Sequence, residues 1–230
     1  MSGHSKWATI HRQKEINDSK KGAVYTRLAA AITIAVKQGR GLQLALDKAK
    51  QFNMPKENIQ RAIDRATGAG GENLEEAMYE GFLPGGVAVI VQVLTDNKLR
   101  TQQQVREVLD KNGGSMAGAG AVSYMFEQVG ELRIMNHELC EDDELKIIDL
   151  NIDEIIKDDG EWVIYCHKER TSEVKEGLEK FGYKVTGVEL VMKPTTLIEV
   201  ANPETRGKIE NLLGKLEELD DVHGVWANYA

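Results

Sequence analysis

The sequence has few cysteines and no long apolar run, and each absence excludes a class of protein. Its 230 residues include only two cysteines, Cys140 and Cys166, which are too few and too far apart for a disulfide framework or a zinc site. No stretch approaches 18 uncharged apolar residues, and the N-terminus lacks the apolar segment of a secretory signal. We therefore expect a cytoplasmic protein that neither crosses nor binds a membrane.

Signatures of catalysis are also missing. The glycine-rich stretches at 68–71 and 113–120 lack the lysine spacing of a phosphate loop and the strand and helix context of a dinucleotide fingerprint. Ser123 lacks the flanking glycines of a nucleophile elbow. The histidines are scattered without the spacing or the acid and thiol partners of metal ligands. We predict a protein that is not an enzyme and that holds no metal and no cofactor.

Charge is distributed unevenly along the chain. The net charge is -8, but residues 1–40 hold eight Lys and Arg against two acids, whereas residues 131–230 hold 12 basic and 24 acidic residues. A polyanion is attracted to the first segment and repelled by the last, which predicts oriented binding through the N-terminal end. The acidic half either keeps the protein soluble or contacts a protein partner.

The basic N-terminal arm, residues 1–22, is the main candidate for binding nucleic acid. Lys and Arg neutralise phosphates, while indole and imidazole stack on bases or donate hydrogen bonds. Two alternatives remain open: the arm is only a solvated terminus, or Trp7 anchors it on the following helices. The predicted contacts, continuing into the first helix, are His4, Ser5, Lys6, Trp7, Arg12, Lys14, Lys20, Lys21 and Arg27.

Several short motifs occur in a characteristic order along the whole chain. They are Gly3 to Ala8 (GHSKWA), Asn53 to Lys56 (NMPK), Tyr79 to Gly81 (YEG), Pro84 to Ala88 (PGGVA), Leu94 to Asn97 (LTDN), Arg100-Thr101, Asn112 to Gly114 (NGG) and Val122 to Phe126 (VSYMF). Their order and spacing resemble the YebC/PmpR family of bacterial regulators, although Thr9, the HRQK run and Lys98-Leu99 depart from its pattern.

The resemblance implies a function and a domain layout. It implies a DNA-binding regulator of transcription, with a helical first domain followed by two α+β domains. Mitochondrial relatives of this family are translational activators, which implies a second hypothesis: a factor that contacts ribosomal RNA and relieves stalled elongation. The residues alone do not separate DNA from RNA, because neutralisation of phosphates does not depend on whether the sugar is ribose or deoxyribose.

Hydrophobic periodicity predicts the same α+β class. Apolar residues with helical spacing over residues 21–66 predict three short amphipathic helices, followed by a linker at 67–73. After the linker, apolar residues recur with a period of two, which is typical of strands. We expect strands at 87–94 and 121–126 on either side of one helix, and elements in the order βαββαβ over 131–193. A strand at 195–200, a helix from Pro203 and a strand at 222–229 complete the chain.

These elements predict two ferredoxin-like domains, one inserted in the other. The expected boundaries are an arm at 1–22, a helical bundle at 23–79, a first ferredoxin-like domain at 80–130 and 194–230, and an inserted one at 131–193. Two consecutive irregular domains are the alternative.

A third functional hypothesis is an enzyme or small-molecule sensor with a cleft between the two α+β domains. Polar side chains gather at the ends of the helix that follows the strand at 87–94. Asp96 and Asn97 have a simpler interpretation as a turn that caps this helix. The candidate cleft residues are Thr95, Asp96, Asn97, Arg100, Thr101 and Asn112.

Overall fold

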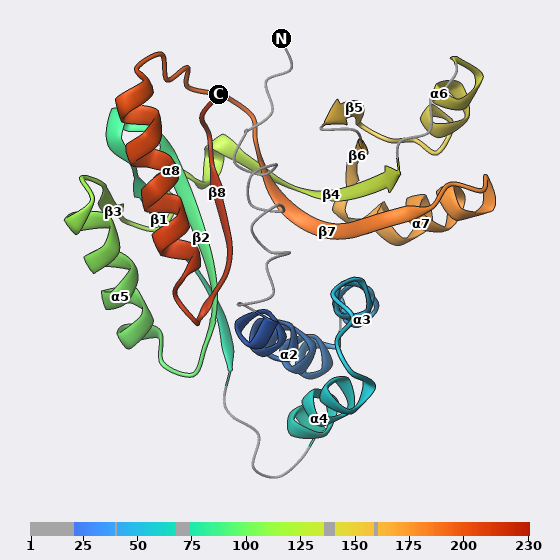
Figure 1. Ribbon diagram of the computed structural model, residues 1–230, viewed down its shortest axis with the longest axis horizontal. Helices are drawn as coiled ribbons and strands as arrows, with labels where there is room; N and C mark the ends of the chain where they lie inside the picture. Colours follow the sequence, from blue (N-terminus) through green and yellow to red (C-terminus); the bar gives the residue numbers. More distant parts are fainter. Residues whose placement is uncertain (1–20, 40, 68–73, 136–140, 159–160) are drawn as a thin grey trace.

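The computed structural model describes residues 21–39, 41–67, 74–135, 141–158 and 161–230. Over these residues the chain forms a helical region and two four-stranded antiparallel sheets, each with helices against one face (Figure 1). The predicted α+β class is confirmed. Among the described helices, none is long and apolar enough to cross a membrane.

The helical region consists of α2 (Lys21–Gln38), α3 (Leu42–Gln51) and α4 (Lys56–Thr67). Glycines separate α2 from α3: Gly39 and Gly41 have φ of +66° and +72°, a conformation that costs glycine little. Leu28 and Ile32 of α2 are buried against Ala49 and Ala62 from the other two helices. The three helices were predicted correctly, and each buries its apolar stripe on the others.

The first sheet contains β1 (Glu75–Phe82), β2 (Ala88–Thr95), β3 (Ser115–Ala117) and β8 (Val222–Ala227), in the order β3-β1-β2-β8. Helices α5 (Lys98–Lys111) and α8 (Pro203–Glu217) pack on one face, where alternate valines of β2 meet Leu109 and Leu212. Asn202 caps α8 by accepting the Glu204 N–H at 2.8 Å.

Three predictions for this sheet were wrong. Residues 123–125 form the 3₁₀ turn η3 (Ser123–Met125) rather than a strand. Within the described part of the chain, residues 195–200 form an isolated bridge, between Ile198 and Tyr229, instead of the predicted strand. Residues 75–79, assigned to the helical unit, instead belong to β1. The turn η2 (Pro84–Gly86), with positive φ at Gly85 and Gly86, folds β1 directly back on β2. Strand β2 already has β1 on one side and β8 on the other, so residues 195–200 cannot pair with it as a further strand.

The second sheet contains β4 (Phe126–Met135), β5 (Glu154–Asp158), β6 (Glu161–His167) and β7 (Val185–Pro194), in the order β5-β6-β4-β7. With α6 (Glu141–Ile148), the turn η4 (Lys168–Arg170) and α7 (Thr171–Lys180), these elements have the predicted ferredoxin-like order. Leu132, Ile164 and Leu178 are fully buried between sheet and helices. All of this sheet lies, in sequence, between β3 and β8, so it is inserted in the first.

The side chain of Glu80, in β1, binds the segment through which the chain passes from the first sheet to the second. Its buried carboxylate accepts backbone N–H bonds from Gly120 at 2.7 Å, Val122 at 2.6 Å and Ser123 at 3.0 Å. The returning chain is tied to the same turn, because Thr195 donates its N–H to the Met125 carbonyl at 2.8 Å. These contacts hold the two sheets next to each other.

The faces of the two sheets that carry no helices turn towards the centre of the molecule, and the helical region lies below them (Figure 1). Polar contacts join the parts. Lys48 of α3 binds Glu189 of β7 at 2.9 Å, and Lys175 of α7 binds Asp47 of α3 at 2.7 Å. Arg27 of α2 donates to a backbone carbonyl at the end of α8.

Candidate nucleic-acid interface

Most of the predicted contacts lie outside the described residues: His4, Ser5, Lys6, Trp7, Arg12, Lys14 and Lys20. Lys21 is the first residue of α2. Arg27 is half-buried, and its Nη2 donates to the Glu217 carbonyl, whereas its Nε is buried without a partner among the described residues. Arg27 therefore attaches the helical region to α8. Phosphate binding by these nine residues stays a prediction.

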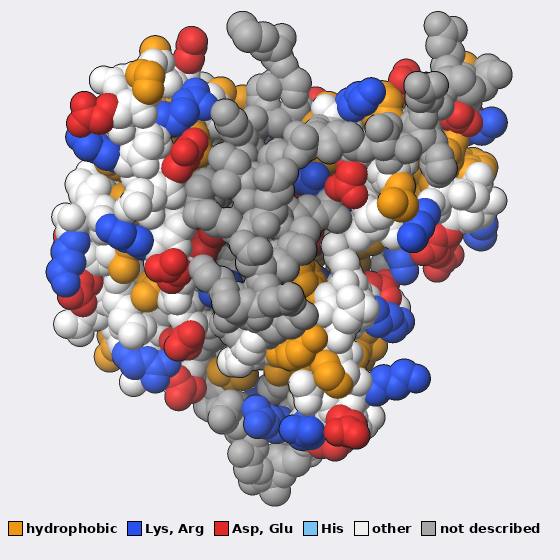
Figure 2. Space-filling model, in the orientation of Figure 1, with side chains coloured by type: hydrophobic (Ala, Val, Ile, Leu, Met, Phe, Trp, Pro, Cys, Tyr) orange, Lys and Arg blue, Asp and Glu red, His pale blue; other side chains and the backbone are white. Residues whose placement is uncertain are grey.

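The described helices extend the basic character of the arm. Residues 1–67 hold 13 Lys and Arg against five acids, so this region carries +8 and the remainder of the chain -16. Figure 2 shows Lys and Arg side chains over the helical region at the lower end of the molecule. The exposed cations of α2, α3 and α4 are Lys37, Lys50, Lys56, Arg61 and Arg65.

One of the five acids in this region is directed inward. Asp47 of α3 is bound by Lys175 at 2.7 Å and by the Gln43 amide at 3.0 Å. Although burial opposes it, these partners hold the pKa of Asp47 below its ordinary value. The negative charge of Asp47 is thus compensated within the protein, which leaves the outer surface of the helices more basic.

Five of the six candidate cleft residues come together at the start of α5. The Thr95 and Thr101 hydroxyls are 2.8 Å apart, and Arg100 Nη2 donates to both Asp96 and Asp221 at 2.8 Å. Asn97 caps α5 by accepting the Arg100 N–H at 3.1 Å, as its simpler interpretation predicted.

The acceptor at the centre of this cluster, Asp221, was not predicted. Both threonine hydroxyls and Arg100 donate to it, and these bonds hold its pKa below the ordinary value although burial opposes them. Asn112 lies at the other end of α5, where its side chain binds the Val108 carbonyl and Lys215. The cluster satisfies its own hydrogen bonds, and a ligand-binding role for it remains a hypothesis.

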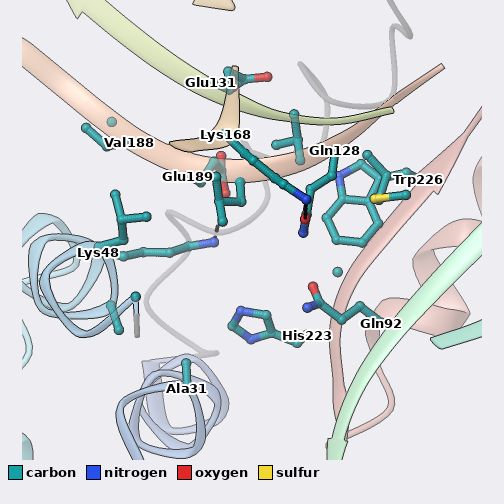
Figure 3. Close-up of a pocket in the computed structure, with 18 of the residues that line it drawn as sticks. Ala31, Lys48, Gln92, Gln128, Glu131, Lys168, Val188, Glu189, His223 and Trp226 are labelled. Carbon is teal, nitrogen blue, oxygen red and sulfur yellow. Dashed lines mark hydrogen bonds and ion pairs between the residues drawn. The ribbon is translucent and has the colours of Figure 1, made fainter. Parts of the chain in front are cut away.

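A cavity of about 1180 Å³ lies between the helix-free faces of the two sheets and helices α2 and α3. None of the six candidate cleft residues lines this cavity; its walls come from other segments, which lie far apart in the chain. Figure 3 shows Gln92 of β2 with His223 and Trp226 of β8 on one side, and Gln128, Lys168 and Glu189 on the other. Lys48 reaches in from α3.

Charges in the cavity wall are largely paired. Lys48 binds Glu189 at 2.9 Å, Arg133 binds Glu131 at 2.8 Å, and Lys193 binds Glu154. Burial, together with the positive charges of Lys48 and Arg27, lowers the pKa of His223 to about 3. His223 is therefore neutral at pH 7. The described residues include no group of three or more His, Cys, Asp or Glu placed to hold a metal ion.

Comparisons with known proteins match nearly the whole chain. Residues 5–69 match the family model for the TACO1/YebC protein N-terminal domain, and residues 74–229 match the model for the TACO1/YebC second and third domain. The chain belongs to the TACO1/YebC family.

Curated relatives in this family share both length and sequence with the chain. A probable transcriptional regulatory protein of Caldanaerobacter subterraneus is 43% identical over 238 residues, covering 99% of this chain and 98% of the relative. One from Listeria monocytogenes has the same identity and coverage. Their names support a regulatory role for this TACO1/YebC protein.

A solved structure supports the fold. The crystal structure of a conserved hypothetical protein from Aquifex aeolicus is 38% identical and superposes with a TM-score of 0.85, covering 93% of this chain and 91% of that one. The same arrangement of a helical region and two sheets is therefore found in another chain of similar length.

Proposed function

We propose that this protein is a DNA-binding regulator of transcription that engages DNA through its basic arm and the exposed cations of α2, α3 and α4. The observation that carries the proposal is the charge distribution, +8 over residues 1–67 against -16 over the rest. Phosphates attract the first region and are repelled by the second, so binding is oriented. The names of the curated relatives, probable transcriptional regulatory proteins, agree with this role.

The test replaces the arm lysines and arginine with glutamine at Lys6, Arg12, Lys14, Lys20 and Lys21. Binding of a promoter-length duplex is measured by fluorescence anisotropy at several salt concentrations. The slope of log K against log salt should fall by about 0.9 for each phosphate that the variant no longer neutralises. A matched control replaces the same number of positive charges in the acidic half: Lys146, Lys157, Lys180, Lys184 and Lys208. An unchanged slope in the arm variant would refute the proposal.

Ribosomal RNA is the second candidate target, because the same positive charge neutralises phosphates of either polymer. Sedimentation of a cell lysate through a sucrose gradient, with and without nuclease, separates the two. If the full chain migrates with ribosomes and a variant lacking residues 1–22 does not, the arm acts on the ribosome. If both remain in light fractions while the full chain shifts promoter fragments, DNA is the target.

A further inference from the structure

The indole of Trp226 lies flat along its own strand inside the central cavity. A Cβ built at Gly224 would be only 2.4 Å from the indole Cη2, so the ring covers the position where any other residue would place a side chain. In the sheet, Gly224 pairs with Gln92 and Trp226 pairs with Ile90. The ring therefore extends beside Gln92, and Trp226 lines the cavity (Figure 3).

Hydrogen-bonding groups surround this ring on several sides. Gln92 belongs to the same sheet, and its amide donates to Glu76 at 2.5 Å. Gln128 and Lys168 come from the second sheet and its adjoining turn, and their polar atoms are 3.5 Å apart. The Nδ1 of His223 is buried without a partner in the described part of the chain. Figure 3 shows all four residues around one open space.

The charge of the wall favours a flat, uncharged ligand group. Glu131, Glu154 and Glu189 also line the cavity, and each is bound by a Lys or Arg, so the wall offers no strong excess of positive charge to hold a phosphate. An aromatic face flanked by amides instead suits a nucleobase, whose ring stacks and whose edge both donates and accepts hydrogen bonds.

We propose that the central cavity binds the nucleobase of an unpaired nucleotide, stacked on Trp226, with its edge hydrogen-bonded by Gln92, Gln128 and His223. This inference rests on the proposed nucleic-acid binding and extends it, because a base held in a duplex cannot enter the cavity. The base comes either from a single-stranded segment of the polymer or from a free nucleotide.

The first experiment uses the emission of Trp226. In the full chain, Trp7 and Trp162 are replaced by Phe, which leaves Trp226 as the only tryptophan; the control keeps Trp162, on the helix-covered face of the second sheet, and replaces the other two. Each variant is titrated with a single-stranded oligonucleotide of about 12 nucleotides and, separately, with adenosine and cytidine monophosphates. We expect quenching of Trp226 and none of Trp162.

The second experiment measures affinity. Trp226→Ala should weaken binding of the single-stranded oligonucleotide by about 5- to 150-fold, the range for removal of one base-aromatic stack. Trp226→Phe should keep most of the affinity, and both variants should bind duplex DNA like the parent. Because Trp226 also packs against the hydrophobic cluster that contains Ile90 and Phe126, the Phe variant and Gln92→Leu are included to separate ligand binding from folding.

The outcomes separate this inference from the proposed function. If neutralising the arm weakens all binding while the Trp226 variants bind single strands like the parent, with no quenching, the cavity proposal is wrong and the arm proposal stands. If the mononucleotides quench Trp226 as strongly as the oligonucleotide, the site is supported and its source is the free nucleotide. Quenching by the oligonucleotide alone places a base of the polymer in the cavity.

Discussion

Removing the negative charge of Glu80 should destabilise the connection between the two sheets. In Glu80→Gln, one carbonyl oxygen remains to accept the Val122 and Ser123 N–H groups, while the new amide nitrogen faces the Gly120 N–H. One charge-assisted hydrogen bond disappears, one buried donor is left unpaired, and the other bonds weaken. Together these changes cost about 2 to 4 kcal/mol in free energy of unfolding.

The destabilisation should be measurable as a fall in the melting temperature of about 5 to 15 °C, since each kcal/mol shifts a chain of this size by about 2 to 4 °C. Circular dichroism follows the unfolding. Glu107→Gln is the matched control: Glu107 is an exposed helix residue that pairs with Lys111, four residues on, so its replacement should leave the melting temperature nearly unchanged.

The pH dependence of the stability difference between the parent and Glu80→Gln can refute this reasoning. Although burial opposes it, the three N–H donors hold the pKa of Glu80 below the ordinary value of 4.5. The stabilisation is therefore complete above that value and is lost as the pH falls through the lower pKa of the folded protein. The parent and Glu80→Gln should differ at pH 7 and converge in acid. Equal stability at pH 7, or a difference that persists in acid, would refute the reasoning.

Three further substitutions are tested by urea denaturation. Gly207→Ala, on an open face of α8, should raise the free energy of unfolding by about 0.5 to 1 kcal/mol, because alanine loses less backbone entropy. Gly81→Ala should lower it by about 1 to 3 kcal/mol, because its Cβ would lie 2.7 Å from the Ser115 carbonyl oxygen; a gain like that at Gly207 would contradict this. Thr101→Val should cost about 1 to 3 kcal/mol by removing a buried donor to Asp221, and a neutral effect would show that the bond contributes nothing.

Sequence patterns predicted the elements whose signals are local. Helices α2, α3 and α4 follow from apolar spacing and terminal glycines, and the βαββαβ order of the second sheet follows from alternating periods. Strand β1 has weaker signals, because its sequence EEAMYEGF places acids beside small residues. Its conformation depends on pairing with β2 and β3. The residues at 195–200 have a clear strand pattern, but β1 already occupies the position next to β2.

The two candidate binding sites, the basic arm and the central cavity, also differ in how far the sequence alone reveals them. The basic arm is visible in the sequence because charge density needs no fold. The central cavity is not, because Gln92 and Trp226 become neighbours only when β8 pairs with β2, and Gln128 approaches them only when the second sheet is placed. A polar Gln92 within the apolar run of β2 was the available signal, but one polar residue in a strand is equally typical of an exposed face.

The arm and the cavity should therefore contribute to binding in physically different ways. Attraction of phosphates to the arm is long-ranged and weakens with salt, since it depends on the release of counterions. Stacking of a base on Trp226, within a wall whose charges are largely paired, is short-ranged and depends little on salt. The arm accordingly sets the slope of affinity against salt, and the cavity sets the affinity that remains at high salt. A polymer with both exposed phosphates and unpaired bases uses both sites, whereas a regular duplex uses only the arm.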